Sequence, residues 1–253
     1  MNIATQPLFR TVLADTPDLR QAAQSLRYDV FVTELGADGP NVDHARRLEG
    51  DAFDDICDHL LLVDGQSGCV AGAYRLIRPE HVADTGTYYS AAEFDLGPLQ
   101  SSGKRLLELG RSCLRPEYRG GTAMYHLWNA LAAYVAEHRI EILFGVASFH
   151  GTDPEALAAP LSLLHHRHRA PDAICPKARA PHAASMNRMP EAQIDRLKAT
   201  RDIPALIKGY LRLGGQVGEG AWIDHAFNTT DVCLVLDTGA LNTRQRQIYT
   251  RQQ

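Results

Sequence analysis

Residues 104–149 constrain the fold more than any other part of the chain, because apolar runs of strand length stand on both sides of a helical pattern. The two apolar runs are residues 104–114 and 140–149. Between them, residues 121–139 repeat apolar side chains at the spacing of a helix that covers a sheet. Strands that feed a helix and then another strand are typical of a mixed α/β sheet.

Two more strands and a first helix precede this segment. Residues 59–64 and 69–77 are strand patterns around a glycine-bounded turn, which predicts a hairpin. Residues 17–35 carry a helical apolar pattern that begins at a Thr-Pro pair, a common start of a helix. Residues 36–58 lack periodicity and are predicted to form a long loop, and long loops inside compact domains are often functional.

The C-terminal half is less regular. Residues 150–200 are rich in alanine, histidine, proline and arginine, and we interpret them as a helical, basic insertion within a single domain of residues 1–253. In and after this insertion we expect helices near residues 154–166, 190–199 and 203–208, and strands near residues 209–217, 221–227 and 231–237.

Composition limits the class of protein. The net charge of −4 argues against nucleic-acid binding through overall positive charge. Five cysteines without a C-x-x-C pair argue against a disulfide framework and against a zinc site, so no metal is expected. The N-terminus has no signal-peptide pattern, and no apolar run approaches the ~20 residues of a membrane span. We therefore expect a soluble, cytoplasmic protein.

A glycine-containing loop joins the strand of residues 104–114 to the helix of residues 121–139. Glycines let the backbone turn tightly and direct its N–H groups outward, and a helix N-terminus adds positive potential. The loop is therefore either an ordinary turn or an anion site. The residues that would form the anion site are Leu114, Arg119, Gly120, Gly121 and Thr122.

Strand, loop and helix together resemble the GCN5-related N-acyltransferase fold, a central mixed and mostly antiparallel sheet flanked by helices. The loop of that fold has the pattern Arg/Gln-x-x-Gly-x-Gly/Ala and binds the phosphates of the acyl donor. Residues 119–123 match it in part, since Thr122 stands where a glycine is usual. This departure weakens the match to coenzyme A pyrophosphate, whereas an acyl carrier protein (ACP) presents only one phosphodiester.

An acidic motif, Glu49-x-Asp51-x-x-Asp54, lies in the second half of the long loop. Taken alone, this motif is either a solvated loop or a loose cation site. Glu108 stands among leucines in a predicted strand. A carboxylate in such a setting is either one half of a buried salt bridge or functional.

Arginines accompany these acids in a fixed order along the chain. An Arg-x-x-x-Phe pair on the first helix, one helical turn apart, precedes the acidic motif, and Gly-x-x-Arg and Glu-x-x-Arg follow on later strands. The matching residues are Arg27 and Phe31, Glu49, Asp51 and Asp54, Gly72 and Arg75, and Glu108 and Arg111. This ordered set resembles the acyl-homoserine-lactone synthases, which are ACP-dependent acyltransferases of the same fold.

The second half of the chain resembles the ornithine N-acyltransferases, the hemolysin-like branch of the fold. The segments that carry this resemblance are Phe144–Asp153, Leu164–His166, Lys208–Gly214 and Asp224–Val232. With the first half, the resemblance covers residues 20–240. It implies transfer of a 3-hydroxyacyl group from ACP to the α-amine of L-ornithine, which gives lyso-ornithine lipid. It implies no permanently bound cofactor.

The resemblance also implies roles for individual residues. Glu108 is the expected general base beside the thioester, with Arg111 as its catalytic neighbour. Cys113 is expected to be a packed side chain, because no histidine is placed in the sequence to activate it as a nucleophile. The expected substrate-binding residues are Arg27, Phe31, Glu49, Asp51, Asp54 and Arg75. Alternatively, the arginines only brace the acidic loop.

A run of basic residues lies inside the predicted insertion, and Arg167 and Arg169 belong to it. The run is either a solvated loop or a docking patch for ACP, whose surface is acidic. Contact with the inner face of the cytoplasmic membrane through the lipid product is a further expectation.

Three other functions stay open. The first is an acyl-homoserine-lactone synthase that uses acyl-ACP and S-adenosylmethionine. The second is an acetyl-CoA-dependent acetyltransferase, which Thr122 and the long insertion disfavour. The third is a catalytically silent module that binds acyl-ACP.

Overall fold

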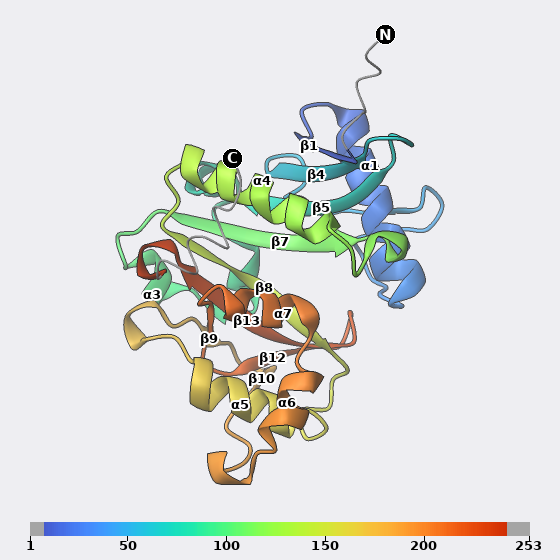
Figure 1. The fold of residues 1–253 in the computed structure, drawn as a ribbon. Coiled ribbons are helices and arrows are strands. Elements are labelled where there is room, and N and C mark those ends of the chain that lie inside the picture. Colours follow the sequence, from blue (N-terminus) through green and yellow to red (C-terminus); the bar gives the residue numbers. More distant parts are fainter. Residues whose placement is uncertain (1–7, 242–253) are drawn as a thin grey trace. The chain divides into compact units, whose positions relative to one another are not determined.

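The computed structural model describes residues 8–241, which fall into two compact units. The first unit contains residues up to 77 together with residues 109–138, and the second contains residues 78–108 together with those that follow residue 138. Each unit is described by itself below, and Figure 1 labels its elements.

The first unit is built on an antiparallel sheet. Its elements are β1 (Phe9–Leu13), α1 (Pro17–Arg27), a π-helical stretch (Tyr28–Glu34), β2 (Val42–Asp43), β3 (Leu48–Glu49), β4 (Asp58–Asp64), β5 (Val70–Ile77), the larger part of β7 (Leu106–Leu114) and α4 (Ala123–Glu137). Strand β4 pairs with β1 on one side and with β5 on the other, both antiparallel. The predicted hairpin and both predicted helices are confirmed, and β1 is a strand that the sequence did not reveal.

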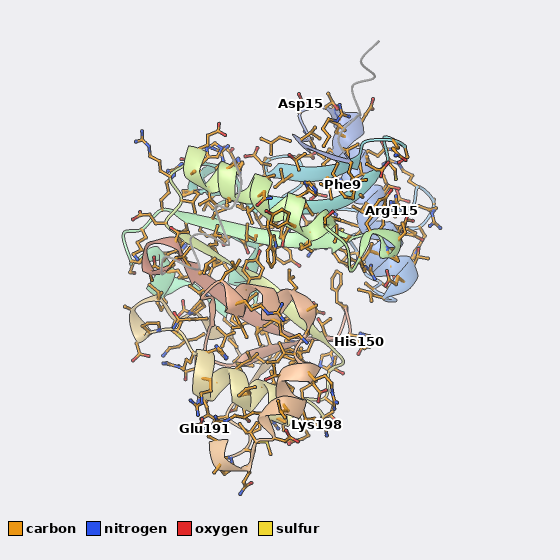
Figure 2. The ribbon with its side chains drawn as sticks, in the orientation of Figure 1. Phe9, Asp15, Arg115, His150, Glu191 and Lys198 are labelled. Atoms are coloured by element: carbon orange, nitrogen blue, oxygen red, sulfur yellow. The ribbon has the colours of Figure 1, made fainter. Side chains whose placement is uncertain are left out.

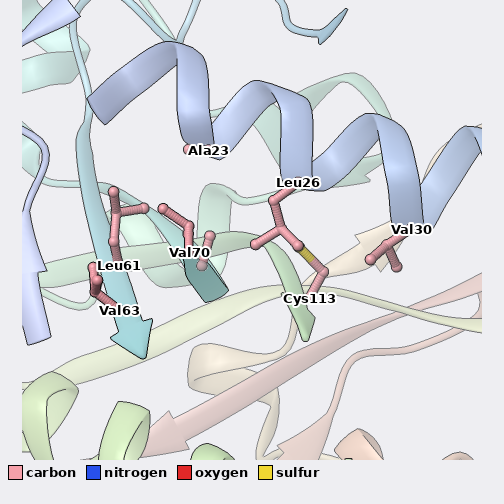
Figure 3. Packing of buried hydrophobic residues seen from close by; sticks show 8 residues of the cluster. Ala23, Leu26, Val30, Leu61, Val63, Val70 and Cys113 are labelled. Carbon is pink, nitrogen blue, oxygen red and sulfur yellow. The ribbon is translucent and has the colours of Figure 1, made fainter. Parts of the chain in front are cut away.

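Helix α1 covers one face of this sheet. Its residues Ala23 and Leu26, and Val30 just beyond it, form a buried cluster with apolar side chains of β4 and β5 (Figure 3). Leu61 and Val63 alternate along β4 with Leu60 and Leu62, so the cluster takes only one of the two faces. The helix carries the apolar side chains at helical spacing, and its N-terminus is capped by Thr16, as the sequence indicated.

Helix α4 covers the opposite face. Gly72 of β5 lies against it, and a Cβ atom there would stand 2.9 Å from Cδ1 of Leu127 and closer still to the side chain of Leu114. A larger residue would force helix and strand apart. The glycine of the Gly-x-x-Arg pattern therefore has a packing role, whereas the arginine three residues later reaches the acidic loop, as shown below.

The second unit is a mixed, mostly antiparallel sheet with helices around it. Its elements are α2 (Pro79–Thr85), β6 (Phe94–Asp95), α3 (Gly97–Gln100), the start of β7, β8 (Ile142–His150), α5 (Ala158–His168), β9 (Lys177–Ala178), β10 (Ala183–Ala184), α6 (Arg196–Asp202), α7 (Ala205–Arg212), β11 (Gln216–Val217), β12 (Ala221–Asp224) and β13 (Thr229–Asp237). Residues 106–108 pair in parallel with β8, and β8 pairs antiparallel with the full length of β13.

The order of elements in the C-terminal half agrees with the sequence in most places. The exception is the strand expected at residues 209–217, which is wrong for most of its length because α7 continues to Arg212 and only Gln216 and Val217 pair as a strand. An apolar run of that length is compatible with both structures, and the spacing of its buried residues is helical. Among the described residues, no helix is long and apolar enough to cross a membrane.

Candidate active site

Arg27 is the last residue of α1 and is fully buried. Its guanidinium donates two hydrogen bonds to the carboxylate of Asp54, forms an ion pair of 2.6 Å with Oε2 of Glu49, and also bonds the backbone carbonyl of Glu49. Both acids are buried as well. The first arginine of the predicted set therefore joins two of the three predicted acids.

Two further arginines complete the network. Nη1 of Arg75 donates to Asp51 at 2.5 Å and to Asp54 at 3.0 Å. Nε of Arg111 donates to Glu49 at 3.0 Å, and its Nη2 donates to Asp51 at 3.2 Å. Three arginines and three carboxylates thus alternate, and each carboxylate contacts two arginines.

Electrostatics favours the charged form of Asp54. Burial alone would raise the pKa of Asp54, but the hydrogen bond from Arg27 and the charges of Arg27 and Arg75 outweigh it and hold that pKa well below its ordinary value. Burial lowers the pKa of the neighbouring His59, whose Nε2 lies 2.9 Å from the backbone oxygen of Asp54. His59 is therefore neutral at physiological pH.

This geometry agrees with the alternative in which the arginines brace the acidic loop. Asp51 and Asp54 are each held by two arginines, so their carboxylates already have ion-pair partners inside the protein. Phe31 packs against the core cluster from the π-helical stretch. Direct contact of these residues with a substrate stays a prediction.

Gly50 and Gln24 belong to the same network, although the sequence did not single them out. Nε2 of Gln24 donates to Oδ2 of Asp54 at 3.0 Å. A Cβ atom on residue 50 would lie 2.7 Å from that Nε2 and 2.9 Å from that Oδ2. Only glycine lets the loop approach α1 this closely, and a glycine between two acids was the available sequence signal.

Arg111 lies within β7 and has a backbone φ of 51°. A positive φ is uncommon for a residue with a side chain, and a residue that keeps one is held there by its surroundings. The two hydrogen bonds from Arg111 to Glu49 and Asp51 supply that restraint. The backbone of β7 at Arg111 is therefore tied to the acidic loop by these two bonds.

Glu108 is almost completely buried in the second unit. Its carboxylate accepts hydrogen bonds from the backbone N–H groups of Tyr89 at 2.7 Å and Ser90 at 2.6 Å, and from the hydroxyl of Ser90. Such donors stabilise a carboxylate in its charged form, which a general base must have before it accepts a proton. Burial and the charge of Glu108 raise the pKa of the adjacent Tyr88 to about 12.

The glycine loop has the features expected of an anion site. Gly120 adopts φ 75°, and Thr122 precedes the first turn of α4. Within residues 8–241, the backbone N–H groups of Gly120, Gly121 and Thr122 have no hydrogen-bond acceptor. Three such N–H groups at the start of a 15-residue helix favour an anion.

Two arginines beside this loop hold it to neighbouring segments. The guanidinium of Arg119 bonds the backbone oxygen of Leu114 at 3.0 and 2.9 Å and makes two bonds to the carboxylate of Glu34. Arg115, labelled in Figure 2, bonds Asp29 at 2.9 Å. Arg119 was predicted to contact the donor phosphate, and the structure places it as a clamp between the loop and the π-helical stretch.

Cys113 lies in the core cluster of the first unit (Figure 3). Burial raises the pKa of its thiol to about 12, so the thiolate needed for nucleophilic attack is scarce at physiological pH. We expect Cys113→Ala to retain turnover within about threefold, because a packed small side chain tolerates a conservative change. Steady-state kinetics with an acyl donor test this expectation. A loss of 100-fold or more in a variant that is still folded would reveal a covalent role.

Arg167 and Arg169 of the basic run form ion pairs within the protein that the sequence did not indicate. Arg167 forms an ion pair with Glu191, and Arg169 bonds Asp172 at 2.7 Å and Glu219 at 2.8 Å. The bonds to Glu219 and Asp172 raise the pKa of Arg169. Docking of an acidic partner at these two arginines stays a prediction, and it would have to compete with these internal pairs.

Comparison with known proteins relates this chain to acyltransferases. Residues 26–129 match the acetyltransferase (GNAT) domain family. The L-ornithine N(alpha)-acyltransferase of Rhodobacter capsulatus is 54% identical over 94% of this chain and 92% of its own, and that of Brucella abortus is 42% identical over 94% and 87%.

Solved structures agree at the level of the fold. The CoA-dependent acyl-homoserine lactone synthase BjaI superimposes with a TM-score of 0.54 over 96% of this chain and 87% of its own, at 12% identity. Since identity is this low, the likeness concerns the fold alone. With relatives of more than 40% identity over nearly the whole length, the chain belongs to the L-ornithine N(alpha)-acyltransferase family of GNAT-fold acyltransferases.

Proposed function

We propose that this protein transfers a 3-hydroxyacyl group from acyl carrier protein to the α-amine of L-ornithine and so forms lyso-ornithine lipid. The observation that carries the proposal is the 54% identity with an L-ornithine N(alpha)-acyltransferase, and the buried network of three acids and three arginines in this chain supports it. Peripheral contact with the cytoplasmic face of a membrane, through the lipid product, is part of the proposal.

The chemistry requires a neutral amine that attacks a thioester carbonyl. The C–N bond forms as the C–S bond breaks, the amine proton passes to the carboxylate of Glu108, and the pantetheine thiolate leaves. The α-amine of ornithine is easier to deprotonate than the distal amine, because its pKa is lower by roughly two units. A backbone N–H near Cys113 and Leu114, where β7 ends, would stabilise the negative charge on the carbonyl oxygen.

Two features support a carrier protein as the donor. Thr122 replaces a glycine in the phosphate loop, and a loop with three N–H groups without an acceptor is sufficient for a single phosphodiester. No acyl-enzyme is needed, because Cys113 is buried as a protonated thiol and direct attack by the amine gives the product in one transfer.

The decisive experiment supplies purified protein with 3-hydroxyacyl-ACP, with the same acyl chain on coenzyme A, and with an unsubstituted acyl-ACP, each in the presence of ornithine. We expect lyso-ornithine lipid by mass spectrometry, fastest with 3-hydroxyacyl-ACP. Faster turnover of acyl-CoA would overturn the donor assignment. Release of a lactone from S-adenosylmethionine instead would identify an acyl-homoserine-lactone synthase, and no turnover of any donor would identify a binding module.

The docking patch has its own test. Replacing Arg167 and Arg169 together by glutamine should lower kcat/KM for acyl-ACP and flatten its dependence on ionic strength, because fewer charge pairs form in the encounter. Glutamine is preferable to glutamate, since Asp172 and Glu219 would repel a new carboxylate beside them. The kcat/KM for a soluble pantetheine thioester is the control. An unchanged salt dependence would leave the two arginines as structural residues.

A further inference from the structure

A hollow of about 260 Å³ lies in the first unit beside the buried network. The short β2–β3 hairpin forms much of its wall, with α1 and the acidic loop beside it. Its volume is below the ~300–1,000 Å³ of sites that hold drug-sized ligands. The hollow therefore suits a small molecule of few heavy atoms.

Two side chains of opposite charge, Asp43 and Arg46, line this hollow. Asp43 and Arg46 stand on the hairpin, where the backbone N–H of Arg46 donates to Oδ1 of Asp43 at 2.9 Å. Among residues 8–241, no ion pair involves either charged group. Asp51 lines the hollow too, but Arg75 and Arg111 already hold its carboxylate.

The rest of the wall contains both apolar and amide groups. Val42 and Leu48 supply apolar surface, and Asn41 supplies an amide. Apart from Asp51, which the arginines hold, the wall thus offers one cation, one anion and some apolar surface. A linear amino acid with a carboxylate, a short methylene chain and a distal ammonium has the complementary set of groups.

We propose that this hollow is the binding pocket for the acceptor amino acid, with Arg46 pairing its carboxylate and Asp43 pairing its distal ammonium. This inference rests on the proposed function and locates the acceptor within it. Arg46 can make two parallel bonds to a carboxylate, which fixes the orientation of the α-carbon. The methylene groups then lie against Val42 and Leu48.

The hollow shares part of its wall with the buried network of arginines and acids. Gln24, Gly50 and Asp51 belong both to its wall and to the network. Asp51 in turn bonds Arg111 in β7, the strand whose C-terminal end leads to the phosphate loop. The network arginines, Arg27, Arg75 and Arg111, therefore position the acceptor pocket and need not touch the amino acid themselves.

The test measures the KM for ornithine at saturating acyl donor in Arg46→Met and Arg46→Lys. We expect Arg46→Met to raise that KM about tenfold or more, because a charge-assisted pair is lost, and Arg46→Lys to recover part of it. The KM for the acyl donor should not change. Arg47→Met is the matched control, since Arg47 is the next residue, pairs with Asp29 and lies outside the wall.

A second experiment tests whether Asp43 binds the distal ammonium of ornithine. Wild type should prefer ornithine over norvaline, which lacks that ammonium, and Asp43→Asn should reduce the preference about tenfold or more. Asp55→Asn is its control, because Asp55 forms a surface pair with Arg20 and should leave the preference unchanged. Asp224→Asn tests a rival location, since Asp224 lies near Glu93 and Asp231 in the second unit.

The outcomes separate the two proposals. A wild type that does not acylate ornithine overturns the proposed function and this pocket with it. An active wild type whose Arg46 and Asp43 variants match their controls overturns the pocket alone. A preference for ornithine that is lost in Asp224→Asn and kept in Asp43→Asn places the ammonium in the second unit and equally overturns the pocket.

Discussion

Glu108→Gln is expected to lower kcat by ~10²-fold or more, the usual contribution of a general base. Glutamine keeps the size of the side chain but cannot accept the amine proton. The KM for acyl-ACP should change little, because the phosphate loop and any docking surface are unaltered. Steady-state kinetics at neutral pH measure both quantities, and they should be compared at a temperature where the variant is folded.

The surroundings of Glu108 require a control for stability. Its carboxylate accepts bonds from Tyr89 and Ser90, so the amide of a glutamine would turn a donor toward at least one of these N–H groups. An unsatisfied buried donor costs about 1–3 kcal/mol in the free energy of unfolding. Ser90→Ala removes the hydroxyl bond to Glu108 and keeps both N–H bonds and the carboxylate, so it should lose stability and retain most of its kcat. Near-normal turnover in Glu108→Gln would show that Glu108 is structural.

Arg27→Met is expected to lower the free energy of unfolding by about 3–5 kcal/mol, the usual result of removing one partner from a buried ion pair. It leaves Glu49 and Asp54 buried with less compensation. Arg20→Met on the same helix is the matched control. Arg20 pairs with the exposed Asp55, and a surface pair contributes about 0–1 kcal/mol. Denaturant unfolding of both variants measures the difference, and equal losses would refute a special role for the buried pair.

The same variant should change how stability depends on pH. The pKa of Asp54 is lowered in the folded protein, so its contribution is present above its unfolded pKa of about 3.9 and is lost as the pH falls from there toward the folded value. Wild type should therefore lose stability below about pH 4. In Arg27→Met this loss should be smaller, because Arg27 no longer depresses the pKa of Asp54, whereas Arg75 and Gln24 still do. Unfolding curves between neutral and acidic pH compare the two slopes.

The main elements of the fold could be read from the sequence because their patterns are local. The apolar runs of β4, β5, β7 and β8 and the helical spacing of α4 each lie within a few turns or strand residues. The set of Arg27, Arg75 and Arg111 with three acids was also accessible, since its members keep a fixed order. Their exact pairing was not, because either bracing or substrate binding satisfies the same order.

Other features depend on contacts between distant residues. Ser90 lies 18 residues before Glu108 and carries no pattern that would relate the two. Glu219 lies 50 residues after Arg169, so the basic run looked uncompensated in sequence. The strand expected at residues 209–217 failed for the opposite reason, since its local pattern fits a short helix equally well and the tertiary structure decided.

The π-helical stretch after α1 has a consequence for the direction of its side chains. In an α-helix, residues seven apart lie only about 20° out of phase, so Glu34 would share the buried side of Arg27. A π-helix turns less per residue and shifts that phase. Arg27 can thus point into the core while Glu34 reaches the exposed guanidinium of Arg119. Deleting one residue from this stretch would restore the regular pitch, keep the buried network and release the clamp on the glycine loop.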